Sequence, residues 1–501
     1  MGVQEKSVVI IGAGISGLKA AAQLYGGGVK ECVLLEARNR IGGRLNTVSG
    51  YKGRKYDMGA SWHHDTIVNK LFLEEAELAK TSGQKRFVFD DDYPILIDDF
   101  RGRIDYNEDL YLEILDNELA TFVDFEYRQK LGTPDCSFRD IILKYLFEKR
   151  EFLTDDQIKY LPEVSRYLEL WHGISWDKIS AKDSFFGHQG RNALVLHYDK
   201  IVERIGRSFP QDWIKLDTEV KAIRREGNSV VVSTKGGGQY KADYVIVTVP
   251  QSILKLSLDN DVDVEGKIEF DPPLNSRIKT AFNTISYGSL GKVVFEFEKC
   301  LWSTKSTKIV TLAHAKDEIV SQVRNAANWQ QLVGSSFAQR SVSPDSVWNF
   351  PLLFVNLAKS TGVPSFVMLM QEPLTQFVES LKGDKNRIFK FFNPVLDRLM
   401  DVLGAGQVVN EMHSDRVDST NPVLKNIIVT NWSNDPFSLG AYSACHPGDE
   451  PLDMVTALTA GQDSRIRFAG EHTIMDGAGC AYGAYEAGIR EANYVLENTN
   501  P

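Results

Sequence analysis

Three glycines near the N-terminus have the spacing of a phosphate-binding turn. Gly12, Gly14 and Gly17 follow the uninterrupted apolar run Val8–Ile11, which is typical of a parallel strand buried on both faces. Gly12 permits a tight turn, Gly14 lets backbone N–H groups approach a phosphate, and Gly17 lets the following helix pack closely on the strand. The N-terminus of that helix would face a negatively charged group. The sequence therefore predicts a pyrophosphate site here.

An acidic residue follows at the distance that a dinucleotide site requires. Glu36 ends the apolar run Val33–Leu35, about 20 residues after Gly17, where a carboxylate can accept hydrogen bonds from both ribose hydroxyls. Glycine-rich turns also recur without a ligand, so the turn alone is weak evidence. The strand before it, the helix Leu18–Leu24 after it and the acid together indicate a dinucleotide.

A second motif narrows the choice of dinucleotide. Gly42 and Gly43 stand directly before Arg44, and this arrangement resembles the second fingerprint of flavoproteins with two dinucleotide-binding domains. In those proteins the glycine pair and the arginine meet the FAD pyrophosphate. A solvated basic turn would explain the arginines, Arg38 and Arg40 among them, but not the adjacent glycines.

Another glycine-rich loop lies near the C-terminus. The segment Gly477–Ala484 opens a predicted helix over Ala481–Leu496. The helix dipole would stabilise negative charge on the N1 and C2-carbonyl region of a reduced flavin ring. We expect the nearby Glu471 to hold the ribityl or pyrophosphate region.

Lys292 interrupts an otherwise apolar strand pattern. The segment Leu290–Phe297 alternates as a half-buried strand, but Lys292 shares a face with Val294. A lysine there must extend its ammonium group to water or have a function.

The segment Gly50–His64 is predicted to form a hairpin that leads into a tight turn at Gly59, Ala60 and Ser61. Small residues in the turn suit a backbone that lies against a flat ring system. The side chains of Trp62 and the two histidines after it would stand at the edge of that ring. Farther on, the three carboxylates Asp90–Asp92 repel one another, and such a run is usually a solvated turn.

The periodicity of the remaining chain predicts helices first and strands afterwards. Within residues 66–200 the helical segments are Leu71–Leu78, Leu110–Phe125 and Tyr160–Leu170. Strand patterns return at Val230–Thr234 and at Tyr244–Pro250, and the second of these is a buried parallel-type strand that rejoins the dinucleotide sheet. Strands within Phe350–Met370 and a pair of helices within Phe377–Leu403 predict a second domain with an antiparallel sheet.

Composition excludes several classes of protein. The 501 residues, 43% hydrophobic and 25% charged, suit a soluble globular protein of two or three domains. A net charge of −10 gives no support to a nucleic-acid-binding face. The five cysteines are scattered without a Cys-x-x-Cys pair, so we expect reduced thiols, no disulfide and no metal site. We find no membrane-length apolar run, no room for a signal peptide and no Ser-Lys-Leu terminus, and therefore expect a cytoplasmic protein without a membrane partner.

The motifs together resemble those of the flavin-containing amine oxidases. The resemblance rests on the glycine fingerprint, on Gly59–His64 and on Phe468–His472, and more narrowly it is to the fungal polyamine oxidases, which oxidise spermine and its acetylated relatives. It extends from about Val8 to about Glu491. We place no motif in residues 313–347.

The resemblance implies an α/β fold in which an FAD-binding Rossmann-type domain, of the two-dinucleotide-binding-domain class, is interleaved with a mixed α+β substrate domain. The FAD domain would take residues 1–85, 201–289 and 422–501, and the substrate domain 86–200 and 290–421. The implied reaction is hydride transfer to flavin N5 from the carbon beside a secondary amine of spermine or an N-acetylated polyamine. With O2 as the acceptor, the products would be a shorter polyamine such as spermidine, an aminoaldehyde and H2O2.

The resemblance also assigns roles to single residues. Lys292, which would bind a water near flavin N5, and His64 would be catalytic. The substrate would meet Trp62, Asp91, Trp171, His188, Asn192, Leu290, Tyr442 and Cys480, with Asp91 binding a substrate ammonium. The cofactor would be held by Gly12, Ala13, Gly14, Ile15, Ser16, Gly17, Glu36, Ala37, Arg38, Gly43, Arg44, Gly59, Ala60, Ser61, Trp62, Val220, Trp432, Gly470, Glu471, Cys480 and Ala481. FAD would be noncovalent, because Ala441 stands where covalently flavinylated relatives have cysteine.

Other readings remain open. A monoamine or amino-acid oxidase of the same fold would differ only in its pocket. A lysine-demethylase relative would need a coiled-coil insertion and a histone-reading module, and neither fits in this chain. A protein that binds FAD without catalysis is a third possibility. The sequence does not distinguish a monomer from a homodimer.

Overall fold

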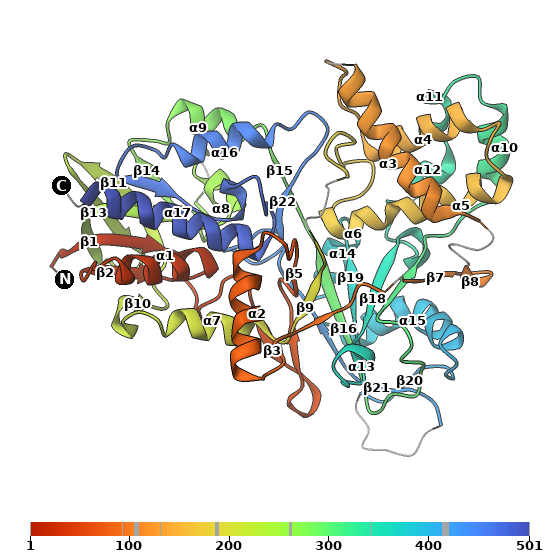
Figure 1. Cartoon of the computed structure of the whole chain (residues 1–501), viewed down its shortest axis with the longest axis horizontal. Helices are drawn as coiled ribbons and strands as arrows, with labels where there is room; N and C mark the ends of the chain where they lie inside the picture. The colour runs from red at the N-terminus through yellow and green to blue at the C-terminus, as the bar shows by residue number, and fades with distance from the viewer. Residues whose placement is uncertain are drawn as a thin grey trace.

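The computed structural model describes residues 2–92, 94–104, 110–130, 132–185, 190–259, 263–340, 342–412 and 420–499. The molecule is elongated, with two halves built around two eight-stranded sheets, and both termini lie at the same end (Figure 1). Each sheet takes its strands from separate stretches of the chain. Within the described residues no helix has the length and apolar character needed to cross a membrane.

The first sheet has the strand order β10-β2-β1-β13-β12-β11-β14, with β23 also beside β13. Its parallel strands are β1 (Gln4–Ile11), β2 (Cys32–Leu35), β10 (Ile214–Lys215), β13 (Gln239–Val247) and β23 (Ile466–Phe468). The strands β11 (Val220–Glu226), β12 (Ser229–Thr234) and β13 form an antiparallel meander, and β14 (Glu269–Asp271) pairs with β11 in parallel. The predicted return of the strand before Pro250 to the dinucleotide sheet is confirmed.

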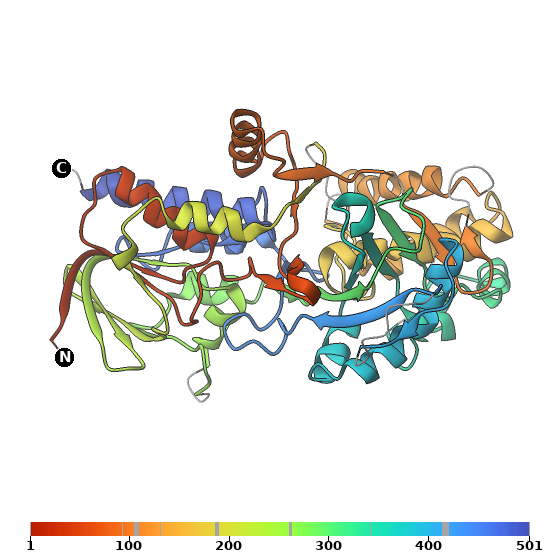
Figure 2. The ribbon, with the colours of Figure 1, turned by 90° about the horizontal axis from the view of Figure 1, so that it is seen from below.

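Helices cover both faces of this sheet, which is why the second half of β1, Val8–Ile11, is apolar throughout. Val8 and Ile10 pack on one face with α1 (Ile15–Gly26), α7 (Tyr198–Gly206) and α17 (Ala481–Thr499), which lie together in Figure 2. Val9 and Ile11 pack on the other face with α8 (Gln251–Leu256), α9 (Ser276–Ala281) and α16 (Pro451–Thr459). The strand–turn–helix unit and the C-terminal helix predicted from sequence are thereby confirmed.

The second sheet has the order β20-β21-β16-β19-β18-β17-β7-β8 and is mainly antiparallel. Its strands are β7 (Ile95–Asp98), β8 (Gly102–Ile104), β16 (Gly291–Phe297), β17 (Lys308–Thr311), β18 (Leu352–Asn356), β19 (Ser365–Met370), β20 (Val409–Asn410) and β21 (Val423–Val429). The helices α14 (Leu374–Ser380) and α15 (Lys385–Val402) cover one face, as expected. The prediction that β16 is half-buried is wrong. All seven of its residues are buried, because a second layer of helices covers the other face.

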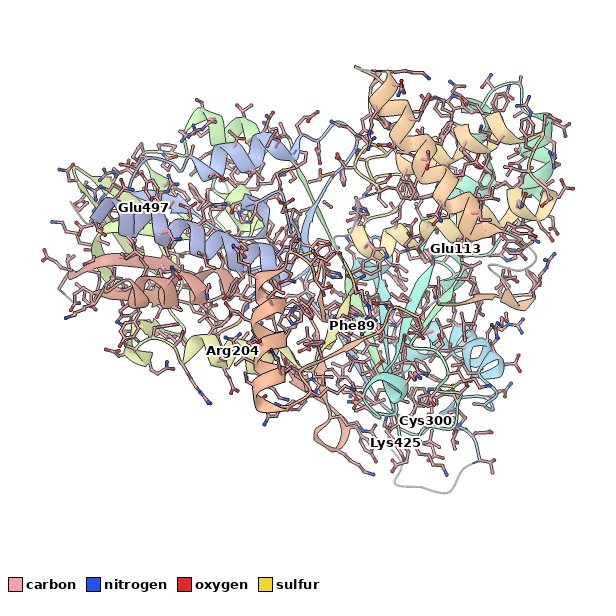
Figure 3. All side chains as sticks on the ribbon, viewed as in Figure 1. Phe89, Glu113, Arg204, Cys300, Lys425 and Glu497 are labelled. Atoms are coloured by element: carbon pink, nitrogen blue, oxygen red, sulfur yellow. The ribbon has the colours of Figure 1, made fainter. Side chains whose placement is uncertain are left out.

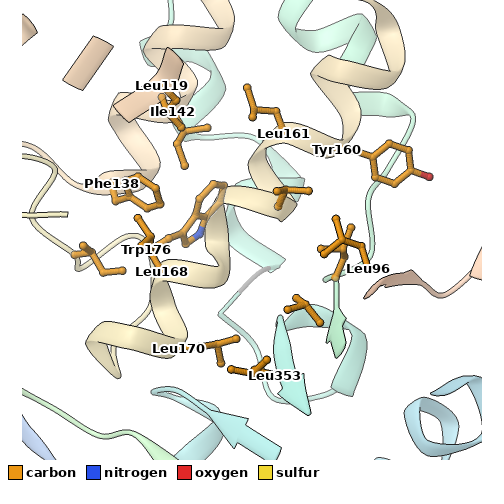
Figure 4. Close-up of a cluster of buried hydrophobic side chains, with 14 of the residues drawn as sticks. Leu96, Leu119, Phe138, Ile142, Tyr160, Leu161, Leu168, Leu170, Trp176 and Leu353 are labelled. Atoms are coloured by element: carbon orange, nitrogen blue, oxygen red, sulfur yellow. The ribbon is translucent and has the colours of Figure 1, made fainter. Parts of the chain in front are cut away.

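That second layer surrounds the buried indole of Trp176 (Figure 4). It comprises α3 (Leu112–Gln129), α4 (Phe138–Lys149), α5 (Asp155–Ser165), α6 (Glu169–His172), α10 (Glu318–Asn325), α11 (Gln330–Val333) and α12 (Ser336–Arg340). The stretch 313–347, to which the sequence assigned no motif, supplies the last three of these helices. The predicted helices before residue 200 are confirmed, although the third one is divided between α5 and α6.

Three small sheets lie where the two halves meet. They are the hairpin β3 (Thr47–Ser49) and β4 (Lys55–Asp57), the sheet β5 (Trp62–His63), β9 (Ala193–Val195) and β6 (Phe87–Phe89), and the pair β15 (Ser286–Gly288) and β22 (Tyr442–Ala444). Figure 3 labels Phe89, at the end of β6, in this middle region. The remaining helices are α2 (Lys70–Ser82) and α13 (Leu357–Ser360). The predicted hairpin before the Gly-Ala-Ser turn is confirmed.

Candidate active site

A cavity of about 700 Å³ runs between the two halves. One end is lined by the first glycine turn, by Glu36 after β2 and by Val220 at the start of β11. The other end is lined by side chains from β16, β19 and α6 and by the segment around β5. A molecule that fills the cavity therefore contacts both halves of the protein.

Each glycine of the first turn has a distinct environment. Gly12 has a φ of +100°, and a Cβ built there would lie 2.7 Å from Thr248 Oγ1. A Cβ on Gly17 would lie 2.0 Å from the carbonyl oxygen of Gly12, so this position must be glycine for the helix to approach the turn. A Cβ on Gly14, by contrast, would enter open space, and Gly14 lines the cavity. The turn thus leaves room at the N-terminus of α1 for an anionic group.

Glu36 is fixed at the end of β2 by two backbone N–H groups. Its Oε2 accepts from the N–H of Ala13 at 2.7 Å, and its Oε1 accepts from the N–H of Arg38 at 2.9 Å. The residue is buried yet lines the cavity. Its carboxylate is therefore positioned, with lone pairs remaining, to accept hydrogen bonds from a ligand. Ala13 and Gly17 themselves lie behind the wall and shape it without lining it.

An ion pair between the partly exposed Arg44 and the buried Glu471 forms part of the cavity wall. Arg44 Nη1 lies 2.9 Å from Glu471 Oε1, and the same nitrogen donates to the carbonyl oxygen of Ala441 at 2.7 Å. The other carboxylate oxygen of Glu471 accepts from the N–H of Gly479 at 3.0 Å. Burial opposes ionisation of Glu471, but the neighbouring Arg44 guanidinium outweighs it and holds the pKa of Glu471 below its usual value.

Lys292 enters the cavity from β16. Its Nζ donates to the carbonyl oxygen of Asp57 at 3.0 Å and also contacts the carbonyl oxygen of Gly59 and the hydroxyl of Ser61. The side chain is almost fully buried, and burial lowers the pKa of its ammonium group to about 8. Lys292 is therefore close to the boundary between its charged and neutral forms at physiological pH.

Aromatic and imidazole groups form the wall opposite the dinucleotide end. The ring of His64 lies 5.8 Å from the ring of Trp171 and 6.5 Å from that of Trp62. Its Nδ1 is 2.8 Å from Oδ1 of Asn192, and the hydroxyl of Tyr442 donates to the carbonyl oxygen of Trp171. All five residues line the cavity.

His63 points to the opposite side of the short strand β5. Its ring packs against Phe72 and Tyr198, and both ring nitrogens are buried without a hydrogen-bond partner among the described residues. Burial lowers the pKa of His63 to about 3, so its ring is neutral at physiological pH. The cavity is lined by His64 and not by His63, as strand alternation requires.

Most of the other expected site residues also line the cavity. Trp432 donates from its indole nitrogen to the carbonyl oxygen of Met58 at 2.9 Å, and burial raises the pKa of the Cys480 thiol to about 12. Further lining residues are Leu290, Ile15, Ser16, Ala37, Gly43, Ala60, Gly470 and Ala481.

Two expected residues are not placed on this wall. His188 lies outside the described residues. Asp91 lines a separate surface hollow and pairs with Arg191, so it does not line the cavity. Asp90 and Asp91 both follow the end of β6 (Phe87–Phe89), where Asp90 accepts from the indole of Trp62 and Asp91 pairs with Arg191. A contact of Asp91 with a substrate ammonium stays a prediction, limited to a substrate that reaches beyond the cavity.

The cavity also has lining residues that sequence reasoning missed. Asp65, Asp183 and Asp476 contribute carboxylates, and Thr248 follows β13 beside the glycine turn. Thr248 could have been found, because ligands bind at the carboxyl ends of parallel strands and β13 had been recognised as one. The three aspartates lie in loops without a motif, and no signal in the sequence distinguishes them.

Comparison with known protein families identifies the class of protein that shares this arrangement. The model of the flavin-containing amine oxidoreductases matches residues 15–496, which is nearly the whole chain. The chain belongs to this family.

Three relatives of this amine oxidoreductase carry different names. A protein of Candida albicans named corticosteroid-binding protein is 32% identical, over 98% of this chain and 96% of its own. A rice protein named polyamine oxidase 4 is 28% identical, over 97% of this chain and 88% of its own. The human lysine-specific histone demethylase 2 is 25% identical, and the match covers 98% of this chain but 53% of that protein.

The cofactor of this amine oxidoreductase is FAD, and the residues present fit it. The open space at Gly14, the fixed carboxylate of Glu36 and the guanidinium of Arg44 suit the pyrophosphate and ribose of a dinucleotide. The mixed α/β architecture with several sheets is likewise consistent with the family. When bound, the flavin supplies an acceptor for the two electrons that leave the amine, and O2 reoxidises it.

Proposed function

We propose that this amine oxidoreductase is a polyamine oxidase that acts on spermine and N-acetylated polyamines. The observation that supports the proposal most is the single cavity, in which a dinucleotide end continues into a wall of Trp62, His64, Trp171 and Tyr442 with Lys292 between them. Aromatic faces attract ammonium groups and also cover the methylene chains that separate them in a polyamine. The products would be a shorter polyamine, an aminoaldehyde and H2O2.

The charged groups of the wall suit an amine with more than one nitrogen. Hydride departure needs a neutral amine at the reacting carbon, while the remaining nitrogens of a polyamine carry charge. The carboxylates of Asp65, Asp183 and Asp476 line the cavity and would attract such charges. Lys292 would release part of its charge near pH 8, which limits repulsion of a cationic substrate.

The same proposal includes the division of the chain. The FAD-binding, Rossmann-type domain would take residues 1–85, 201–289 and 422–501, and the substrate domain 86–200 and 290–421. The roles given above to Lys292, His64 and the other lining residues belong to the proposal, as do noncovalent attachment of FAD and the cytoplasmic location.

A second candidate is binding of a steroid. It is favoured by the apolar side chains that line the non-dinucleotide end of the cavity, among them Leu168, Leu170, Leu290 and Leu369, and by the name of the relative from Candida albicans. A planar apolar ligand would match these side chains but would carry no positive charge to attract the carboxylates of Asp65, Asp183 and Asp476, which also line the cavity. For that reason we favour the polyamine.

Product analysis separates the candidates. The FAD-loaded protein is incubated in air with spermine, N-acetylspermine, benzylamine and a neutral amino acid, and H2O2 and amine products are quantified. Spermidine and an aminoaldehyde in equal amounts with H2O2 are expected from spermine. Turnover of benzylamine or of the amino acid alone would contradict the proposal. Tight binding of a corticosteroid without turnover of any amine would favour the second candidate.

A further inference from the structure

The first two acids of the run Asp90–Asp92 have their side chains on different faces of the small sheet β6-β9-β5. Val88 and Trp62 both pair with Leu194 of β9, so these three side chains share one face of the sheet. Phe89 and His63 both pair with Ala193, so these three share the other face. Asp90 and Asp91 lie beyond the last residue of β6, so their own contacts decide which set each of them joins. The acid on the face of Trp62 is therefore Asp90, whereas Asp91 joins Arg191, whose guanidinium also lies over the ring of Phe89.

Asp90 makes a buried hydrogen bond to the cavity wall. Its Oδ2 accepts from the indole Nε1–H of Trp62 at 2.8 Å, and both residues are buried. An indole nitrogen has one donor and needs one acceptor, so this bond selects one orientation of the ring. The other carboxylate oxygen, Oδ1, has no partner among the described residues.

One cation compensates the buried charge of Asp90. The Nζ of Lys308, on β17 of the second sheet, lies 3.5 Å from Oδ2, and the hydroxyl of Thr307 donates to the carbonyl oxygen of Asp90 at 3.4 Å. Burial raises the pKa of Asp90, and Lys308 and Trp62 oppose that shift. The carboxylate thus couples the indole to a strand of the second sheet and not to solvent.

Trp62 adjoins both proposed catalytic residues. The Nζ of Lys292 lies 5.7 Å from the centre of the Trp62 ring, and the ring of His64 lies 6.5 Å from it. The carbonyl oxygen of Trp62 is held separately, because it accepts a hydrogen bond from the hydroxyl of Tyr198 at 2.9 Å. The backbone of Trp62 therefore has its own anchor, and the ring depends on Asp90 for its orientation.

We infer that Asp90 is a positioning residue for amine oxidation, which acts by holding the indole of Trp62 in the orientation that shapes the wall beside Lys292 and His64. Lys308 supports it by compensating its charge. The inference rests on the proposed function, because it concerns the same cavity. It assigns a function to one acid of the run, although none of the three acids lines the cavity itself.

A double-mutant cycle tests the link between the two residues. The variants are Asp90→Leu, Asp90→Asn, Trp62→Phe and the double variant Trp62→Phe/Asp90→Leu, with Asp92→Leu as a matched control. Asn keeps an oxygen acceptor for the indole, whereas Leu keeps similar volume without one. Asp92 belongs to the same run but accepts from the backbone N–H of Thr307. Its replacement therefore measures the effect of disturbing this segment without removing the acceptor of the Trp62 indole. Each variant is loaded with FAD, and its rate of flavin reduction by spermine and its thermal midpoint are measured.

We expect Asp90→Leu to slow flavin reduction roughly 10- to 100-fold, because a small misplacement of a positioning group can cost that much. Asp90→Asn should restore most of the rate, and Asp92→Leu should leave it near that of the wild type. In the Trp62→Phe background, Asp90→Leu should have little further effect on the rate. An equal loss in both backgrounds, or a wild-type rate for Asp90→Leu, would overturn the inference.

The thermal midpoints keep this test separate from the proposed function. If no amine reduces the flavin of the wild-type protein, the proposed function fails, but the cycle can still be read from stability. Asp90→Leu should then lower the midpoint more in the Trp62 background than in the Trp62→Phe background. Equal shifts in the two backgrounds would show that the indole does not depend on Asp90.

Discussion

Lys292 and Asp57 meet across the two halves of the molecule, since the Nζ of the lysine on β16 donates to the carbonyl oxygen of Asp57 at the end of β4 at 3.0 Å. The contact positions a buried amine in the cavity wall, beside the turn Gly59–Ser61. It also connects the strand that supplies the lysine with the segment that leads to Trp62 and His64. The proposed catalytic role of Lys292 depends on this junction.

Lys292→Met is expected to slow flavin reduction or reoxidation about 100-fold or more while changing substrate binding little. Loss of an oriented proton-transfer group costs that much, and the lysine is proposed to act beside the reacting centre without binding the amine. Stopped-flow measurement of both half-reactions gives the rates and the apparent substrate affinity. Unchanged rates in both half-reactions would leave Lys292 with a structural role alone.

The ionisation of Lys292 should also appear in stability. Its pKa falls from an ordinary 10.5 to about 8 on folding, so between these values the unfolded chain binds more protons than the folded one. The contribution of Lys292 to the free energy of unfolding therefore rises as the pH increases from about 8 to about 10.5. Below pH 8 the lysine is charged in the folded protein, and the full cost of burying that charge lowers the stability. Relative to Lys292→Met, the wild type should gain stability between pH 7.5 and 9.5, as measured by denaturant unfolding. A constant difference would refute the depressed pKa.

His64→Gln should impair amine oxidation more than His63→Gln. The ring of His64 lines the cavity, whereas that of His63 packs against Phe72 and Tyr198. His63→Gln should mainly affect stability, because it places a polar amide among buried groups. Steady-state turnover with spermine and the thermal midpoint are measured for both variants. If the two variants are equally stable and His63→Gln lowers turnover more than His64→Gln, then His63, and not His64, is the histidine that acts in amine oxidation.

Gly14→Ala should weaken FAD binding about tenfold or more without destabilising the FAD-free protein. A Cβ there enters the open space of the cavity and meets no protein atom. Gly17→Ala is the contrasting variant, because its Cβ would lie 2.0 Å from the oxygen of Gly12 and should lower the stability of the FAD-free protein. FAD titration and thermal unfolding give the two quantities. Unaltered FAD affinity in Gly14→Ala would exclude the turn as the phosphate site.

The flavin should be released by acid or heat. Ala441 offers no atom for covalent attachment, and the Cys480 thiol is a poor nucleophile because burial raises its pKa to about 12. Separation of precipitated protein from the supernatant, followed by absorbance of each, measures attachment. Flavin that remains with the polypeptide would point to Cys445 or Cys480.

The sequence predicted those features that depend on local chemistry. The turn at Gly12–Gly17, the acid at Glu36 and the orientation of His64 relative to His63 follow from neighbours in the chain, and the structure has each of them. Features that depend on distant segments were missed. The burial of β16 on both faces requires helices from elsewhere in the chain, and the contact of Asp90 with Trp62 joins residues 28 positions apart. Neither leaves a local pattern.

The most direct test of the central claim is anaerobic mixing of the FAD-loaded protein with single amines while flavin absorbance is followed. Oxygen is absent, so only transfer of electrons from the amine can bleach the flavin. Spermine and N-acetylspermine should bleach it fully and rapidly, whereas benzylamine and a neutral amino acid should bleach it slowly or not at all. Rapid bleaching by benzylamine with none by spermine, or no bleaching by any amine, would contradict the account.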